Sequence, residues 1–457
     1  MPTNSDEVTL RSARAPLLAR LGLDRPELRA WAMYDWANSA FMTVIVTAVF
    51  PTYYASVAAR GLGRAQATLY YANATTISLA CIAVLSPILG ALADYRAAKK
   101  KFLLAFLTLG VTTTGLLFFI EQGDWLPGLI LFGVANIGVN GSYVFYDSLL
   151  PHIASDDEMD RVSSAGYALG YLGGGLLLLA SLIVILKPTL LGLPTGPEAS
   201  TLPARLSFLA TAVWWAVFAI PLFRRVPEPP MTRERDERIG TAAAIRASIT
   251  RLGETLRELR GYRYAFLLLI ASLIYSDGIN TIIRMAVVYG TEIGIPQQAQ
   301  IAAIVMVQFV GIPFAFLFGM LASRIGAKRA IFIGLAVYAV ISILGYFMHT
   351  TLHFFLLAFL VGTVQGGTQA LGRSLFASMV PRHKSGEFFG FYAVFERFGA
   401  IIGPLVFGAV VAATGSSRLA ILSIISFFVV GAGLLTLVNV KEGQRVARLA
   451  DEGVVRV

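Results

Sequence analysis

Apolar runs long enough to cross a lipid bilayer recur along almost the whole of this sequence. A membrane-spanning helix needs about 20 consecutive apolar residues, and twelve runs have about that length or more. Only 14% of the 457 residues are charged and 56% are hydrophobic, whereas a soluble domain is about a quarter charged. So much apolar surface must face lipid, and the sequence therefore predicts an all-α membrane protein with twelve transmembrane helices. The runs cover approximately residues 31–58, 66–93, 102–120, 125–150, 161–187, 203–223, 264–290, 297–322, 329–348, 352–380, 387–413 and 418–439.

The distribution of positive charge predicts which side of the membrane each connection occupies. Most of the 37 Lys and Arg residues fall near the chain ends and in alternate connections such as 94–101 and 224–263. Cytosolic segments carry such an excess, so we expect both termini in the cytosol. Residues 1–30 hold several arginines and no long apolar stretch, which predicts a cytosolic tail and not a signal peptide. The basic residues would face anionic membrane lipids, so the net charge of +10 needs no nucleic-acid partner.

A short motif that follows the second apolar run returns after the eighth. GALADYRAAKK, residues 90–100, aligns without gaps with GMLASRIGAKR, residues 319–329, and the polar segment 224–263 divides the spans six and six. This plan resembles the major facilitator superfamily, in which the substrate site lies between two halves near the midplane of the bilayer. The resemblance implies two pseudo-symmetric six-helix bundles. In the first copy, Asp94 could face the N-terminus of a helix.

The predicted organisation follows from this repeat. It comprises a cytosolic tail at 1–30, an N-terminal six-helix bundle at 31–223, a cytosolic linker at 224–263, a C-terminal six-helix bundle at 264–440 and a cytosolic tail at 441–457. Within the linker, apolar residues from Ile245 to Leu259 are spaced by three and four, which predicts an amphipathic helix. That helix could lie on the inner membrane surface or pack against the bundle with one face in solvent.

Cysteine and histidine give no sign of a disulfide or a metal centre. Cys81 is the one cysteine of the chain, so no disulfide can form within it. The four histidines lack the spacing of metal ligands. No nucleotide-binding loop and no nucleophile–base pair is recognisable, so we expect neither an enzyme nor ATP-driven pumping, and no cofactor.

Ionisable residues inside the apolar runs are few, and each is a candidate for function. A charge at the bilayer centre costs roughly 2.5–3.5 kcal/mol on insertion scales, and such residues usually face a cavity or a partner. Asp277 and Arg284 lie seven residues apart in the seventh run, on one face of a helix. They could hold the two ends of a zwitterion, or they could neutralise each other or other helices. The predicted substrate-binding residues are Asp277, Arg284, Asn280, Gln369 and Gln365.

The tenth run is unusually polar for a membrane span. It reads GTVQGGTQALGRS over residues 362–374, and so polar a stretch should line water or substrate. We expect Arg373 to face an anion or an acid of the other half, such as Asp35 or Asp147, so that breaking the pair opens a gate. Asp35 and Asp147 lie near the ends of their runs and could instead be interfacial. The predicted gating or proton-coupling residues are Asp35, Asn38, Asp147, Arg373, Asp94, Glu396 and Arg397.

Several stretches, taken together, resemble the autophagy-related protein 22-like family, the vacuolar effluxers of this superfamily. They are MYDWANSAF (33–41), YDSLLPHIA (146–154), SSAGYALGYLGGG (163–175), YSDGINTIIRMAVVYG (275–290), VQGGTQALGRSLFASMVP (364–381) and EFFGFYAVFERFGAIIGP (387–404). The resemblance covers about residues 31–440. It implies export of a small polar or zwitterionic, amino-acid-like solute. The charge bias and the lack of a targeting signal suit a prokaryotic inner membrane.

The function that the sequence predicts is secondary active transport by alternating access. We expect a monomer that exports a small solute with proton coupling, and we expect Asp277→Asn to abolish transport while folding stays intact. One alternative is an exporter of amphipathic drugs or lipids, which predicts an aromatic, weakly charged cavity. The other is a non-transporting membrane sensor whose output is the segment 224–263.

Overall fold

The computed structural model describes residues 17–193, 201–230, 261–398 and 402–453. Helices and their connections make up this part of the chain, and it contains no strand. Eleven of the helices are long and apolar enough to cross a membrane, judged by length and composition. The remaining predicted run, at 387–413, is present as two helices, α15 (Ser385–Phe398) and α16 (Ile402–Thr414). The predicted amphipathic helix of the linker lies outside the described residues.

The helices of the first half follow the predicted runs closely. The first span starts earlier than expected, at Pro26, because proline suits the first turn of a helix. Its elements are α3 (Pro26–Ala40), η1 (Phe41–Val49), α4 (Phe50–Tyr53) and η2 (Tyr54–Ala58). The others are α5 (Arg64–Arg96), α6 (Lys99–Leu116), α7 (Trp125–Ile153), α8 (Met159–Leu186) and α9 (Leu202–Arg225).

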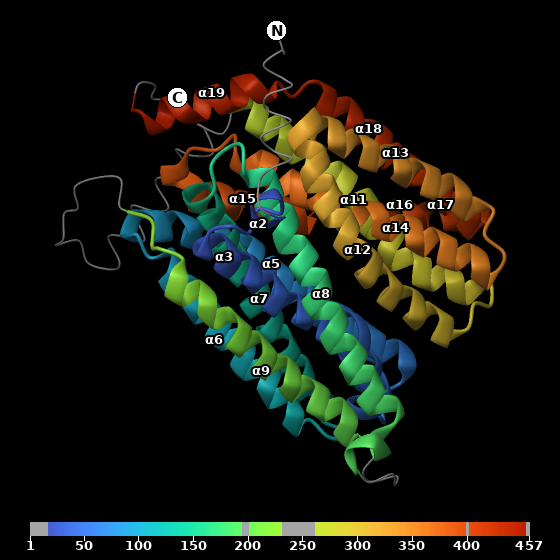
Figure 1. Cartoon of the computed structure of the whole chain (residues 1–457). Helices are drawn as coiled ribbons and strands as arrows, with labels where there is room; N and C mark the ends of the chain where they lie inside the picture. The colour runs from blue at the N-terminus through green and yellow to red at the C-terminus, as the bar shows by residue number, and fades with distance from the viewer. Residues whose placement is uncertain (1–16, 194–200, 231–260, 399–401, 454–457) are drawn as a thin grey trace.

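The helices of the second half repeat this order after the linker. They are α11 (Arg263–Glu292), α12 (Gln297–Ile325), α13 (Ala327–Tyr346), α14 (Thr351–Ala377), α15, α16, α17 (Ser417–Ser423) and α18 (Ile425–Thr436). Figure 1 shows the two halves side by side, with α6 and α9 on one flank and α13 and α18 on the other. The halves meet where α5 packs on α15 and where α8 packs on α12 and α14.

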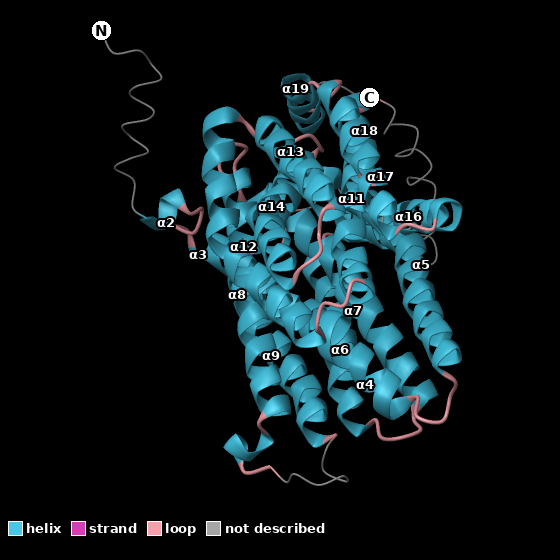
Figure 2. Cartoon of the chain, turned by 90° about the vertical axis from the view of Figure 1, so that its right-hand side faces the viewer, coloured by secondary structure: helices cyan, strands magenta, loops and turns pink. Residues whose placement is uncertain are grey.

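The first described helix, α2 (Leu17–Arg20), and the start of α3 lie toward one end of the bundle, which we call the termini end (Figures 1 and 2). A last helix, α19 (Val440–Asp451), lies at this end. The guanidinium of Arg448 on α19 is 3.1 Å from a carboxylate oxygen of Asp156, which belongs to the connection between α7 and α8. The Asp451 carboxylate accepts a hydrogen bond from the backbone N–H of Arg382. The last helix therefore ties together connections of both halves.

Contact between the halves at the termini end depends on glycine. A Cβ atom placed on Gly90 of α5 would lie 2.2 Å from the carbonyl oxygen of Gly386 on α15. That separation is far below van der Waals contact, so only glycine allows the two backbones to approach this closely. Direct contact between the two backbones at Gly90 and Gly386 therefore sets how closely α5 and α15 approach each other.

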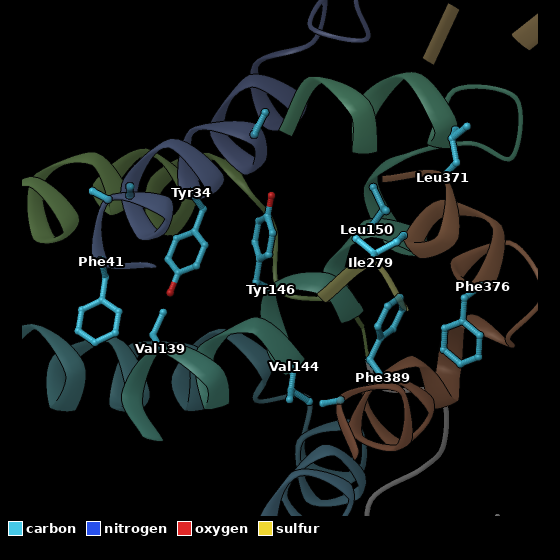
Figure 3. Packing of buried hydrophobic residues seen from close by; sticks show 14 of the residues in the cluster. Tyr34, Phe41, Val139, Val144, Tyr146, Leu150, Ile279, Leu371, Phe376 and Phe389 are labelled. Atoms are coloured by element: carbon cyan, nitrogen blue, oxygen red, sulfur yellow. The ribbon is translucent and has the colours of Figure 1, made fainter. Parts of the chain in front are cut away.

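The first span contains a nine-residue π-helical stretch that periodicity did not predict. This stretch, η1, runs from Phe41 to Val49 and precedes the Phe50-Pro51 pair. Proline has no backbone N–H, and π turns inside α-helices occur often at functional sites. The rings of Tyr34, on α3, and Tyr146, on α7, lie side by side (Figure 3), with their centroids 4.9 Å apart.

The internal repeat extends to backbone conformation. Ala97, after α5, has φ = 45°, and Gly326, the residue that aligns with it after α12, has φ = 89°. Both halves therefore turn from their second helix into their third through a residue with positive φ. Among the described residues that are not glycine, Ala97 alone adopts such a conformation.

Replacing Ala97 with glycine should stabilise the protein by about 1 kcal/mol, because the left-handed region costs an L-residue roughly 1–2 kcal/mol and costs glycine almost nothing. Thermal unfolding in detergent measures the change. The matched control is Ala98→Gly, since Ala98 has φ = −130° and should gain nothing. An unchanged or lower melting temperature for Ala97→Gly would mean that the turn is not strained.

Candidate functional site: a buried ion cluster between the halves

Arg373 of α14 binds two carboxylates of the other half. Its two terminal nitrogens lie 3.2 Å from Oδ2 of Asp35 on α3 and 3.1 Å from Oδ1 of Asp147 on α7. Its Nε donates to Oγ of Ser163 on α8 at 2.9 Å, and one terminal nitrogen donates to the Ser163 carbonyl at 3.0 Å. The Arg373 side chain is 4% exposed. The pairing across the halves that the sequence predicts for Arg373 is therefore present with both acids.

Three aromatic rings enclose the guanidinium of Arg373. Its Cζ lies 4.8 Å from the ring centroid of Trp31, 5.6 Å from that of Tyr146 and 4.6 Å from that of Tyr167. Rings at such distances attract a cation through their π-electrons. Tyr146 also donates its hydroxyl to Asp35 Oδ2 at 2.9 Å, and Trp31 Nε1 donates to the Tyr146 carbonyl at 3.0 Å. The aromatic residues thus hold Asp35 as well as the arginine.

The charges of this cluster do not balance. Two carboxylates face one guanidinium, and the Asp35 and Asp147 side chains are only 7% and 12% exposed. A buried net negative charge is costly, so a proton on one carboxylate would neutralise the cluster. Glu396 of α15 is half-buried and close enough for its charge to act on Asp147. The arrangement can therefore take up and release a proton beside a contact that joins the two halves.

A second polar cluster lies closer to the termini end. Lys99 at the start of α6 is 3% exposed, and its Nζ lies 2.9 Å from Asp94 Oδ1. The same ammonium group bonds to Oγ of Ser385 on α15 at 2.5 Å and contacts Nε2 of His152 at 3.1 Å. Asp94 Oδ2 accepts the backbone N–H of Glu387, in the first turn of α15, at 2.9 Å. Asp94 thus faces the N-terminus of a helix, as the sequence predicts, and that helix belongs to the other half.

Asp94 and Lys99 should stabilise each other, because both side chains are buried and they form an ion pair. Leaving one buried charge unpaired costs more than a surface pair is worth. We expect Asp94→Asn and Lys99→Met each to lower stability by about 1–3 kcal/mol, and the double variant to lose clearly less than the sum. A double-mutant cycle of thermal unfolding tests this. Additive losses would show that the two charges do not stabilise each other.

The residues predicted to bind substrate have different surroundings. Asp277 is buried, and its Oδ2 accepts the backbone N–H of Gly403 at 2.7 Å, in the first turn of α16. Arg284 is exposed, and Asn280 and Gln369 are half-buried. Gln365 lines a cavity of about 240 Å³ between helices of the second half, whereas the other four are not among the residues that line it. Their part in substrate binding stays a prediction.

Three further predicted gating residues are Asn38, Glu396 and Arg397. Asn38 is buried on α3 and accepts a hydrogen bond from the hydroxyl of Tyr143 at 3.0 Å. Glu396 lies near Asp147, as described above. The Arg397 side chain lies outside the described side chains.

Sequence reasoning did not select several residues that complete the two clusters. They are Trp31, Tyr146, Ser163, Tyr167, Lys99, His152 and Ser385. Tyr146, Ser163 and Tyr167 lie within the stretches that carry the family resemblance, 146–154 and 163–175. Their position in these stretches was the signal that could have identified them, because uncharged residues in an apolar run do not otherwise stand out.

Solved structures that resemble this fold include transporters of the major facilitator superfamily. The crystal structure of the human organic anion transporter MFSD10 superposes with a TM-score of 0.68 at 14% identity, covering 92% of this chain and 100% of that one. At this identity the likeness shows the fold alone. The fold and the apolar helices define a multi-pass helical membrane protein with the major facilitator fold.

The chain belongs to the family described as vacuole effluxer Atg22 like, which it matches over residues 63–448. It is 40% identical to the uncharacterized MFS-type transporter YxiO of Bacillus subtilis over 410 residues, which are 90% of this chain and 94% of that protein. It is 26% identical to autophagy-related protein 22 of Yarrowia lipolytica, over 64% of this chain and 52% of that protein.

Proposed function

We propose that the protein is a secondary active transporter that exports a small polar or zwitterionic, amino-acid-like solute by alternating access, coupled to protons. The observation that carries this proposal is the Arg373 cluster. It joins the two halves through charges that only a change of conformation could separate. Membership of a family described as vacuole effluxer-like supports the direction of transport.

The proposed orientation places the termini end in the cytosol of a prokaryotic inner membrane. Several basic residues belong to the two copies of the repeated motif at this end, among them Lys99, Lys100, Arg324 and Arg329. Positive charge is typical of the cytosolic ends of membrane spans. The two polar clusters then close the cytosolic side of the path between the halves. Export from the cytosol would require this closure to open.

The proposed cycle uses the proton to loosen the closure. With both carboxylates ionised, Arg373 has two ion pairs to the first half. Protonation of one carboxylate removes one pair and weakens the contact between the halves. The halves then separate at the cytosolic side, solute enters, and loss of the proton restores the closed contact.

Counterflow in proteoliposomes tests the proposal. Purified protein is reconstituted with a mixture of unlabelled amino acids inside, and uptake of each labelled amino acid is followed with and without an imposed pH gradient. We expect counterflow of at least one amino acid and a change in net flux with the gradient. Absence of counterflow for every amino acid, with protein that unfolds cooperatively on heating, would refute transport of this solute class.

A further inference from the structure

A cavity of about 240 Å³ lies between helices of the second half and does not include the ion clusters. Its walls come from α11, α12, α13, α14 and α17, with Thr47 of η1 and Tyr171 of α8 at the side of the first half. Most lining residues are aliphatic or aromatic, among them Ile282, Ile304 and Val307. The volume is somewhat below the roughly 300–1,000 Å³ of pockets for drug-sized ligands, so it suits a smaller molecule.

The lining of this cavity carries no formal charge. Among the described residues that line it there is no carboxylate, ammonium, guanidinium or imidazole group. Burial of an ion without a partner costs several kcal/mol, and a zwitterion would bring two such ions. The cavity therefore disfavours a charged or zwitterionic molecule and favours an uncharged one.

One polar group in the wall lacks a partner. Tyr289 is 1% exposed, and its hydroxyl makes no hydrogen bond with any described residue. A buried hydroxyl without a partner costs about 1–3 kcal/mol, so a ligand that bonds to it would gain this energy back. Gln300 differs, because its Nε2 already donates to Thr291 and to the Ile295 carbonyl. The Tyr289 hydroxyl is thus the group that would orient a ligand.

We propose that this cavity is a binding site for an uncharged molecule that has an aliphatic or aromatic body and one hydroxyl or carbonyl group. The body packs against the apolar wall, and the polar group bonds to the hydroxyl of Tyr289. The cavity does not include the ion clusters, and the molecule that it favours differs in charge from the proposed zwitterionic solute. The proposal therefore stands whether or not transport is observed.

Photolabelling with an octanol that carries a diazirine in its chain tests the site. This probe is uncharged, largely apolar and has one hydroxyl. In detergent-solubilised protein we expect saturable labelling of cavity residues, mapped by mass spectrometry and competed by plain octanol. Tyr289→Phe should weaken binding roughly fivefold, in line with one hydrogen bond. Labelling that does not saturate, or that falls only on lipid-facing surfaces, would overturn the proposal.

Two comparisons make the test specific. Ala303→Trp should fill the cavity and abolish labelling, whereas Val340→Trp, on an α13 side chain that is 48% exposed, should leave it unchanged. If Ala303→Trp fails to fold, Ala358→Phe fills the same cavity. With the unaltered protein, a diazirine-bearing octanoate should bind at least tenfold more weakly than the octanol. Equal binding of the two probes, or labelling that persists in a folded cavity-filling variant, would contradict the site.

Discussion

The Arg373→Met variant is expected to lose counterflow while the protein still inserts in the membrane. Methionine retains an apolar chain of similar reach but removes both ion pairs, so Asp35 and Asp147 are left buried without their cation. Removal of one partner from a buried ion pair costs about 3–5 kcal/mol. This cost falls on the conformation that is closed at the termini end, because Arg373 bonds to the first half there. A shift of this size changes the balance between conformations by roughly 100-fold or more.

Matched variants separate a gating defect from a folding defect. Arg324→Met removes an exposed arginine at the end of α12 and should leave counterflow intact. The triple variant Asp35→Asn, Asp147→Asn, Arg373→Met removes every charge of the cluster, so it should recover most of the thermal stability that Arg373→Met loses, but no gating. Normal counterflow by a folded Arg373→Met protein would exclude Arg373 from the transport cycle.

Asp147→Asn should uncouple transport from the proton gradient. Asp35 accepts hydrogen bonds from both Arg373 and the Tyr146 hydroxyl. Asp147 shows only the contact with Arg373 among the bonds described, and its side chain is more exposed. Hydrogen bonds to a carboxylate favour its charged form, so Asp147 is the carboxylate that we expect to carry the proton. Asparagine cannot release a proton, so counterflow should continue without gradient-driven accumulation.

The size of this effect is set by the gradient. One pH unit is worth about 1.36 kcal/mol per proton, which supports roughly a tenfold accumulation when one proton moves per solute. The unaltered protein should approach this ratio, Asp147→Asn should stay near equal concentrations, and the control Asp24→Asn, which alters an exposed residue, should behave as the unaltered protein does. Gradient-driven accumulation by Asp147→Asn would assign the proton to another group.

Much of the fold could be predicted because membrane spans leave strong signals. Apolar runs of fixed minimum length located the spans, and the repeat of 90–100 in 319–329 located equivalent turns. The positive φ that these turns share at Ala97 and Gly326 was not predicted. The π-helical stretch at Phe41–Val49 was not predicted, because hydrophobicity does not distinguish π turns from α turns.

The candidate site was predicted in part, and the difference has a physical cause. An arginine in an apolar run usually faces a partner or a cavity, so acids of the other half could be inferred as candidate partners of Arg373 without any distance. Asp277 is also an ionisable residue in an apolar run, but its partner is a backbone group. Its carboxylate accepts a backbone N–H at the start of α16, and such free N–H groups arise wherever a helix begins. Charge patterns show that a partner exists, but they do not show whether the partner is a side chain or a helix end.

Distance measurements between spin labels test most directly the claim that the Arg373 cluster holds the halves together at the termini end. In a Cys81→Ser background, one pair of labels replaces Lys101 and Arg329, in the first turns of α6 and α13 at the termini end. A second pair replaces Gln122 and His349, in connections at the opposite end. All four residues are exposed. For Arg373→Met we predict a longer distance for the first pair and a shorter one for the second, relative to the protein with Arg373. Unchanged distance distributions for both pairs would contradict the account.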